Sequence, residues 1–294
     1  LTSGVHTRII ESPGLWMSEQ DQKQLVADLR GIVTALGIED LEYSIFTGSK
    51  EALDRAVITI IYRGKEKVPL AFNAMAYMNC QLKGYPASVL HLGLTVINPN
   101  EQSKGFTWTL YGLSTALLLI KNRFRPIWIS SVTQVPVILG KVAENFGEIF
   151  PNPQRAQRRT YDHLSLARQI MKNYRQVFGV GPDAEFDEDK FIIKNAYTGG
   201  SDHLKKTYEE CTKHRYESYN ELCLKELDYT RGDDFIQIGK LDLPTIFQYV
   251  FRSIPKNRIM LVIAQGALVF FNSMLAPMLQ WFTTSNQFKA LRPR

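Results

Sequence analysis

The sequence contains few cysteines, and their spacing excludes two classes of protein. The 294 residues include only Cys80, Cys211 and Cys223, which are too few and odd in number for a disulfide framework. None of them lies in a CxxC pair or a Cys/His pattern, so we expect no metal site. Residues 1–30 contain no apolar stretch of the kind found in a signal peptide. The sequence therefore predicts a protein of a reducing compartment, and we expect a cytoplasmic location.

The sequence is basic but lacks the signatures of nucleic-acid-binding domains. Its formal net charge is +6, yet it has no zinc finger, no RNP-like aromatic pattern and no long basic helix. We therefore expect no nucleic-acid partner. Part of the positive charge gathers in short clusters, which are either solvated surface or sites that attract phosphate groups. These clusters are Lys121, Arg123 and Arg125; Arg155, Arg158 and Arg159; and Arg252, Lys256 and Arg258.

Charged residues are missing from a long stretch near the C-terminus, between Ile259 and Phe288. Residues 259–282 are long enough to cross the ~30 Å hydrocarbon core of a bilayer. The basic cluster that precedes them is typical of the cytoplasmic flank of a membrane anchor. Four polar or helix-breaking residues interrupt the stretch. A spanning helix, contact with a lipid or acyl chain, and an ordinary buried helix pair all remain open for it. The interrupting residues are Gln265, Asn272, Pro277 and Gln280.

Apolar periodicity predicts an alternating α/β order in the first half of the chain. Ser18 begins a helix with a capping-box-like start, and Pro136 suits the first turn of another. β-Branched and apolar runs bounded by Gly and Pro predict strands. We expect strands at 5–10, 57–62, 69–78, 88–97 and 126–131, and helices at 18–36, 49–55, 105–122 and 136–145.

The second half is less regular, and we expect it to form a C-terminal extension. The patterns predict a helix over 161–178, a polar loop over 179–189 and a charged helix over 204–227. Strand-like runs at 191–193 and 235–238 could be late strands of the same sheet. The sequence thus predicts a core over 1–150 and an extension over 151–294 that includes the apolar tail segment 259–282.

The most informative motif lies between the strand 88–97 and the helix that follows it. Here Gln102, Gly105 and Thr107 form a Gln-x-x-Gly-x-Thr sequence. Exposed amides at a helix N-terminus bind anions, and glycine lets a phosphate approach the main chain. In this context the motif resembles the pyrophosphate loop of the GNAT acyltransferases, Gln/Arg-x-x-Gly-x-Gly/Ala. Thr107 departs from the small residue that ends the family motif.

The resemblance implies a fold, an activity and a co-substrate. Over roughly residues 5–150, the order strand, helix, helix, strand, strand, strand, helix, strand, helix matches the GNAT core. It implies an α/β fold with a mixed, mostly antiparallel sheet flanked by helices, and transfer of an acyl group from acyl-CoA. The CoA pyrophosphate would be bound by Gln102, Ser103, Lys104, Gly105, Phe106 and Thr107. Main-chain groups of the run Leu94 to Ile97, with Leu94 and Val96 as the named candidates, would hold the pantetheine arm.

The resemblance also suggests catalytic residues. Measured back from the motif, His91 falls where some GNAT enzymes carry a catalytic glutamate, and imidazole can accept a proton at neutral pH. Strand alternation would place His91, Gly93 and Thr95 on one face. The alternative is a structural histidine of the sheet. The tyrosine that many relatives use as a general acid is missing. Gly140 occupies its approximate place, and Ser131 and Thr133 are candidates to contact the thiol or a water.

These features predict an acyl-CoA-dependent N-acyltransferase with a small amine or a lipid-like acceptor. The alternative is a GNAT-like module that binds an acyl group or a partner without turnover. A third hypothesis, a membrane-tethered structural protein, depends on the segment 259–282 alone. If that segment contacts lipid, the protein would be associated with a membrane surface.

Overall fold

The computed structural model describes residues 4–38, 41–64, 66–101, 105–106, 108–154 and 158–247. Contacts between Cα atoms group residues 1–248 into one compact unit and residues 249–294 into another. The described residues all belong to the first unit. The apolar tail segment 259–282 lies outside them, and no described helix is long and apolar enough to cross a membrane.

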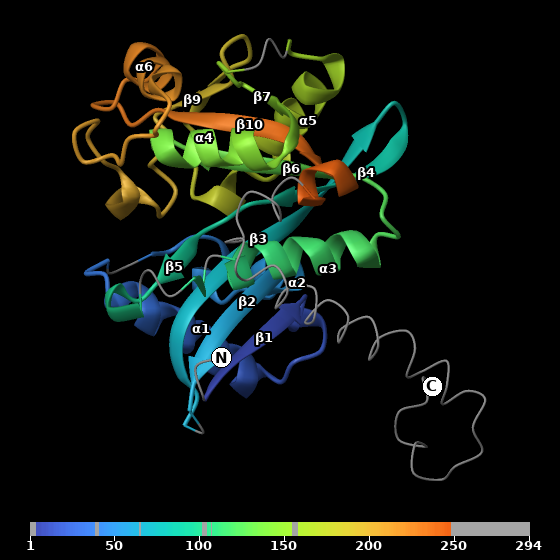
Figure 1. Ribbon diagram of the computed structural model, residues 1–294, viewed down its shortest axis with the longest axis vertical. Coiled ribbons are helices and arrows are strands. Elements are labelled where there is room, and N and C mark those ends of the chain that lie inside the picture. Colours follow the sequence, from blue (N-terminus) through green and yellow to red (C-terminus); the bar gives the residue numbers. More distant parts are fainter. Residues whose placement is uncertain are drawn as a thin grey trace. The chain divides into compact units, whose positions relative to one another are not determined.

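A mixed, mostly antiparallel sheet forms the centre of the described chain (Figure 1). Its strands are β1 Val5–Glu11, β2 Ala56–Arg63, β3 Val68–Leu82, β4 Tyr85–His91, β5 Thr95–Ile97, β6 Ile127–Thr133, β7 Gly147–Phe150, β8 Glu185–Asp187, β9 Ile192–Lys194 and β10 Asp234–Leu241. The strand order is β1-β2-β3-β4-β6-β10-β9-β8, with β5 paired to β3 and β7 paired to β10. Of these pairs β4 and β6 run parallel, and the others run antiparallel. The predicted fold class is confirmed.

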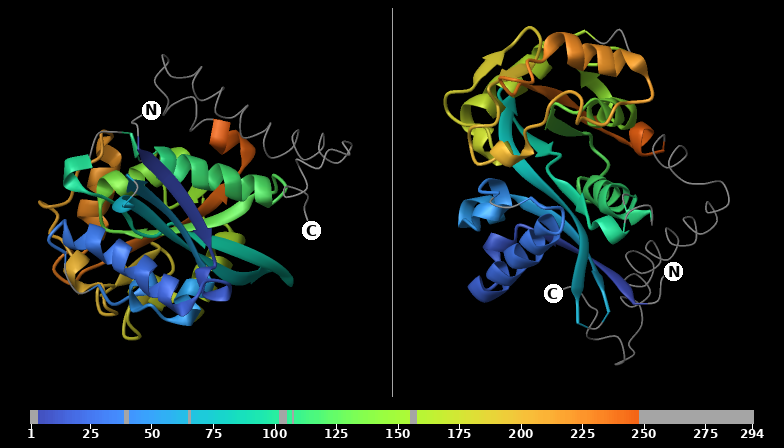
Figure 2. Two further views of the ribbon diagram at one scale, coloured as in Figure 1. Left: turned by 90° about the horizontal axis from the view of Figure 1, so that it is seen from below. Right: turned by 90° about the vertical axis from the view of Figure 1, so that its left-hand side faces the viewer.

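Helices cover both faces of this sheet. They are α1 Glu19–Thr34, α2 Lys50–Asp54, α3 Ser114–Lys121, α4 Pro136–Asn145, α5 Tyr161–Asn173 and α6 Glu217–Glu226. The π-helical turns η4 Trp108–Leu113 lead into α3. Short 3-10 turns are η1 Pro13–Leu15, η2 Ser44–Thr47, η3 Pro99–Glu101, η5 Arg175–Phe178 and η6 Asp202–Leu204. In the right-hand view of Figure 2 the strands separate α1 from α3.

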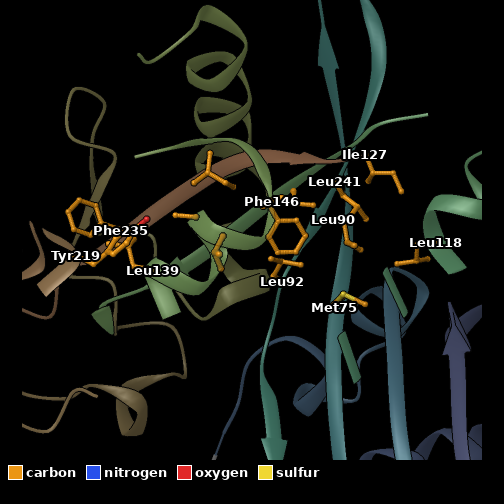
Figure 3. Close-up of a cluster of buried hydrophobic side chains, with 14 of the residues drawn as sticks. Met75, Leu90, Leu92, Leu118, Ile127, Leu139, Phe146, Tyr219, Phe235 and Leu241 are labelled. Carbon is orange, nitrogen blue, oxygen red and sulfur yellow. The ribbon is translucent and has the colours of Figure 1, made fainter. Parts of the chain in front are cut away.

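Two sets of apolar side chains fix these layers. On one face, residues of β4, α3 and α4 such as Leu90, Leu118 and Leu139 form one buried cluster (Figure 3). On the other face α5 packs against β3 and β10, and α1 packs against β2. We refer to these as the α4 face and the α5 face. The alternation of side chains along each strand therefore decides which face a residue serves.

The helix starts predicted at Ser18, Ser49 and Pro136 are confirmed, because their local signals act without help from distant residues. The Ser18 side chain accepts a hydrogen bond from Asp21 N, and Ser49 accepts one from Ala52 N. Pro136 occupies the first turn of α4. The late strands are confirmed as well, since β9 and β10 belong to the same sheet. Residues 151–233, which connect β7 to β10, therefore form an excursion between two paired strands.

The charged helix predicted over 204–227 is wrong, since α6 covers only Glu217–Glu226. In the residues before α6, side chains form hydrogen bonds with nearby main-chain groups. Such bonds favour turns over a helix. Thr207 N donates to Glu210 Oε2 at 2.8 Å, and His214 N donates to Asn220 Oδ1 at 2.8 Å. The helix begins only after this turn.

Strand β3 extends past the end of β2, and α5 covers the edge that this exposes. Pairing with β2 ends at Ala76, whereas pairing with β4 continues to Leu82. The side chain of Gln169 then takes the place of a neighbouring strand. Its Oε1 accepts from Gln81 N at 2.9 Å, and its Nε2 donates to Gln81 O at 2.8 Å.

Candidate active site

A one-residue bulge divides the strand that was predicted over 88–97 into β4 and β5. Ala76 is opposite His91, and Asn73 is opposite Thr95, so β3 advances three residues while the facing chain advances four. A Cβ atom on Gly93 would lie 2.1 Å from the carbonyl oxygen of Ala74, so glycine is needed at this point. The bulge lies where β4 stops pairing with β6.

The strands part at this bulge and form a fork between β5 and β6. Leu92 N donates to Ser130 O at 2.7 Å, and beyond this bond β5 pairs with β3. Leu94 and Asn98 flank β5 and both bond to β3: Leu94 O accepts from Ala74 N, and Asn98 N donates to Leu70 O. Because bonding alternates along an antiparallel strand, Val96 between them also faces β3. The main-chain groups that point into the fork therefore belong to Thr95 and Ile97. Within the predicted run Leu94 to Ile97, the named candidates Leu94 and Val96 instead turn their main-chain groups toward β3.

The predicted pyrophosphate loop follows β5, at the wide end of the fork. Gln102, Ser103, Lys104 and Thr107 lie outside the described residues. Gly105 has φ of +81°, a conformation that favours glycine, and its missing Cβ would meet nothing within 4 Å. Phe106 is buried against Ile61 and Leu70. The apolar helix expected after the loop is confirmed as η4 and α3.

A chain of polar side chains on the α4 face holds η4 against the fork. Asn73 Nδ2 donates to Leu110 O at 3.1 Å, and Thr95 Oγ1 donates to Asn73 Oδ1 at 3.2 Å. The phenol of Tyr111 is hydrogen-bonded with the Thr95 side chain. Burial raises the pKa of Tyr111, and the bond with Thr95 lowers it. Sequence reasoning missed Tyr111, because only the fold brings η4 beside β5.

His91 lies beside the fork but on the α5 face. Its Nδ1 is 3.0 Å from Ser130 Oγ, and its ring centroid is 5.1 Å from that of Phe178. The residue is 4% exposed, and burial lowers its pKa to about 4. Because of the bulge, His91 and Thr95 face opposite sides of the sheet. The expectation that they share a face is wrong.

The other two candidate catalytic residues face α4. Ser131 is buried one position beyond Ser130, so its side chain points to the face opposite His91. Thr133 Oγ1 accepts from Val135 N at 3.0 Å and so helps to turn the chain into α4. The structure therefore does not bring Ser131 and Thr133 together with His91.

The place of the missing tyrosine on α4 is filled by an imidazole. A Cβ atom on Gly140 would lie 2.6 Å from His214 Nε2, so the ring occupies the space of a side chain. His214 Nε2 is 3.8 Å from Glu144 Oε1. Burial lowers the pKa of His214, and Glu144 raises it. No group of metal-ligating side chains occurs among the described residues.

A buried carboxyl group lies at the start of β10 on the α5 face. Asp234 Oδ1 accepts from the Tyr197 hydroxyl at 2.9 Å, and burial raises the pKa of Asp234 to about 7. Phe235 is opposite Thr133, which places Asp234 beside the end of β6. Gln134 follows β6 there; its Nε2 donates to Leu204 O at 3.2 Å, while its buried Oε1 has no hydrogen-bond partner among the described residues. The unpaired oxygen and the buried carboxyl make this a second polar region beside the fork.

The order of elements from β1 to α4 is that of a GNAT-like fold, as the sequence predicts. No protein-family model and no curated protein matches the sequence. The similarities to solved structures are distant and concern the fold. A conserved protein of unknown function from Enterococcus faecalis V583 has a TM-score of 0.34 and 10% identity. The match covers 48% of this chain and 33% of that one, so this chain spans only a third of that protein.

Two further solved structures cover more of the chain. A protein from Desulfovibrio desulfuricans assigned to the GNAT family of acetyltransferases has a TM-score of 0.35 and 10% identity, over 81% of this chain and 98% of that one. The N-myristoyltransferase of Saccharomyces cerevisiae with bound myristoyl-CoA has a TM-score of 0.33 and 11% identity. That match covers 66% of this chain and 54% of the yeast enzyme.

Proposed function

We propose that this chain binds acyl-CoA in the fork and transfers the acyl group to an amine. The observation that carries the proposal is the bulge at Gly93, after which the main-chain groups of Thr95 and Ile97 point away from β3 and into the fork. The pantetheine arm carries two amides and would pair with β5 through hydrogen bonds, as an added strand would. The loop 102–107 would then hold the pyrophosphate at the wide end of the fork.

The chemistry needs positioning and two proton transfers. The amine nitrogen attacks the thioester carbon, the C–S bond breaks, and the electron pair leaves on sulfur. Main-chain amides at the bulge would stabilise the oxyanion. Tyr111 is on the α4 face of the fork, where its hydroxyl could protonate the thiolate. His91 on the opposite face would take the proton that the amine loses, although its low pKa makes it a weak base.

The experiment compares two substitutions of Gly105 that differ only in charge. Both Gly105→Glu and Gly105→Gln strain the left-handed backbone equally, and among the described residues nothing lies within 4 Å of the Cβ position that they share. We expect Gly105→Glu to bind acyl-CoA at least tenfold more weakly than Gly105→Gln by calorimetry, because its carboxylate repels the pyrophosphate. Equal affinities would rule out this loop as the phosphate site.

The second candidate function is a module that binds acyl-CoA without turnover. It is favoured by the burial of His91 beneath Phe178 and by the absence of a tyrosine from α4. The two functions share the binding step and differ in release of free CoA. Incubation of acyl-CoA with a panel of primary amines separates them, since the module would bind acyl-CoA and release no thiol.

A long-chain or lipid-like substrate belongs to the same proposal. It depends on residues 259–282, which would contact lipid or a long acyl chain. Deletion of residues 249–294 removes this segment and leaves all of the described residues in place. We expect turnover of short acyl-CoA to persist and turnover of long acyl-CoA to fall. Unfolding of the remaining unit would identify the segment as core and contradict this expectation.

A further inference from the structure

A groove lies at the end of the sheet remote from the fork. It has a volume of about 930 Å³ and opens between α2, the hairpin of β3 and β4, and the end of α3. Its lining includes Arg55, Tyr85, Lys121, Arg125 and Trp128. The hairpin and the end of α3 lie on the same side of the molecule in Figure 1. The GNAT-like site uses the other end of α3, so this groove has no part in the proposed transfer.

Exposed apolar side chains line this groove or lie within four residues of its lining in the chain. Tyr85 at the hairpin tip is 75% exposed, and Phe124 after α3 is 48% exposed. Trp16, after η1, is 59% exposed, and its Nε1 donates to Glu11 O. Glu11 in turn pairs with Lys121 of the groove lining. Single exposed apolar residues are ordinary, but a set gathered around one groove indicates a binding surface. We call Trp16, Tyr85, Ile120 and Phe124, with the cations Arg123 and Arg125, the groove face.

The turn that carries Phe124 has a strained backbone. Arg123 has φ of +55° and Phe124 has φ of +59°, a region that L residues other than asparagine and aspartate avoid. Main-chain bonds fix this turn: Phe124 N donates to Leu119 O at 2.9 Å, and Arg125 N donates to Asn122 O at 3.1 Å. Residues 120–126 are all exposed. The backbone thus holds an aromatic ring in solvent at a conformational cost that packing does not explain.

The charge of the groove face is positive. The carboxylates that line the groove are paired, Glu51 with Arg55 and Asp54 with Lys50. Arg123 and Arg125 form no ion pair with any residue that the structure describes. Aromatic rings beside arginines are the composition of surfaces that lie at the headgroup level of a membrane. Anionic headgroups would also give the two arginines negatively charged partners.

We propose that the groove face docks on an anionic lipid surface, with Phe124 and Trp16 at headgroup depth and the arginines against lipid phosphates. This interaction is independent of acyl transfer, because the groove face and the fork lie at opposite ends of α3. It also differs from any lipid contact of residues 259–282.

The test measures partition of the full chain onto vesicles of phosphatidylcholine with and without phosphatidylserine. We expect the full chain to bind the mixed vesicles more strongly than the neutral ones, and we expect this difference to disappear at high salt. Arg123→Asn with Arg125→Gln should lower the partition coefficient about 25-fold, from about fivefold per cation. Phe124→Asn should lower it several-fold without loss of thermal stability, because asparagine tolerates the left-handed backbone.

Matched controls remove the same chemistry elsewhere. Lys172→Gln with Lys225→Gln removes two exposed cations from α5 and α6, and Tyr216→Asn removes an exposed aromatic ring. We expect these variants to bind as the wild type does. Equal binding of the Arg123/Arg125 variant and its control would overturn the proposal and assign any lipid binding to another part of the chain. Wild-type protein that ignores both vesicles would overturn it as well, and a shift from dimer to monomer in Phe124→Asn would identify a second copy as the occupant.

Discussion

The main chain of Gly93 lies directly against the carbonyl group of Ala74. The carbonyl oxygen is 2.1 Å from the position that a Cβ atom on Gly93 would occupy. This approach permits the bulge, and the bulge opens the fork. We expect Gly93→Ala to lower the free energy of unfolding by about 1–3 kcal/mol, the usual cost of overpacking. The affinity for acyl-CoA should also fall, since β5 must shift to admit the methyl group.

Gly31→Ala is the matched control for this change. Gly31 lies within α1, and nothing lies within 4 Å of its missing Cβ. Alanine there should stabilise the protein by about 1 kcal/mol and leave acyl-CoA affinity unchanged. Chemical denaturation and calorimetry measure both quantities. Wild-type stability in Gly93→Ala would mean that the bulge does not depend on glycine.

His91 gives a prediction for pH dependence. Its folded pKa of about 4 lies below the unfolded value near 6.5, so the unfolded chain binds more protons between these values. His91 therefore contributes stability that is complete above pH 6.5 and is lost as pH falls toward 4. His163 and His214, whose pKa values burial also lowers, contribute in the same direction. We expect His91→Gln to flatten this slope in denaturation at pH 7 and pH 5.

The same residue is the proposed base, so His91→Gln should lower kcat by about 10²–10⁴-fold with little change in acyl-CoA affinity. The acidic limb of the wild-type rate profile should lie near pH 4, rather than near the ordinary histidine value. Normal turnover in the variant would leave the stability effect intact but remove the catalytic assignment.

Tyr111 is the proposed proton donor to the thiolate. Tyr111→Phe keeps the ring and removes the hydroxyl that meets Thr95. We expect kcat to fall by at least tenfold while KM for acyl-CoA changes little. Donors with acidic thiols, such as aryl thioesters, should be affected less, because their leaving groups need no proton. An equal loss with both kinds of donor would indicate that Tyr111 only supports the fork.

Asp234 should make the protein less stable as pH rises. Its folded pKa of about 7 exceeds the unfolded value near 3.9, so the folded chain binds more protons between these values. The stabilisation is therefore present below about pH 4 and lost as pH rises through 7. Asp234→Asn should gain stability relative to wild type between pH 5 and pH 8, and Tyr197 can still donate to its amide oxygen. If the free energy of unfolding changed with pH equally in wild type and in Asp234→Asn, this prediction would be wrong.

The parts of the fold that the sequence predicts depend on neighbours along the chain. Ser18, Ser49 and Pro136 start helices through contacts within their own first turns, and β2 is recognisable by its β-branched residues. The bulge at Gly93 depends instead on Ala74, which belongs to another strand. No local pattern distinguishes this glycine from one in a turn, so the strand 88–97 was predicted as continuous.

The candidate site follows the same division. The motif around Gly105 is visible in the sequence because the phosphate loop is formed by consecutive residues. Tyr111, Asp234 and Gln134 are placed by η4, β10 and the end of β6, which meet only in the sheet. The sequence also could not predict that the imidazole of His214 packs against Gly140, because His214 comes from the excursion between β7 and β10.

The side-chain amide of Gln169 has a consequence for how this protein behaves in a crowded solution. Because β3 extends past β2, its outer edge would present a free donor and acceptor to any unfolded or identical chain. Gln169 satisfies both groups of Gln81, and the Tyr174 hydroxyl occupies the carbonyl of Asn79. The hairpin can therefore protrude without acting as a template for strand addition. Solubility at this edge depends on two side chains, Gln169 of α5 and Tyr174 at the C-terminal cap of that helix.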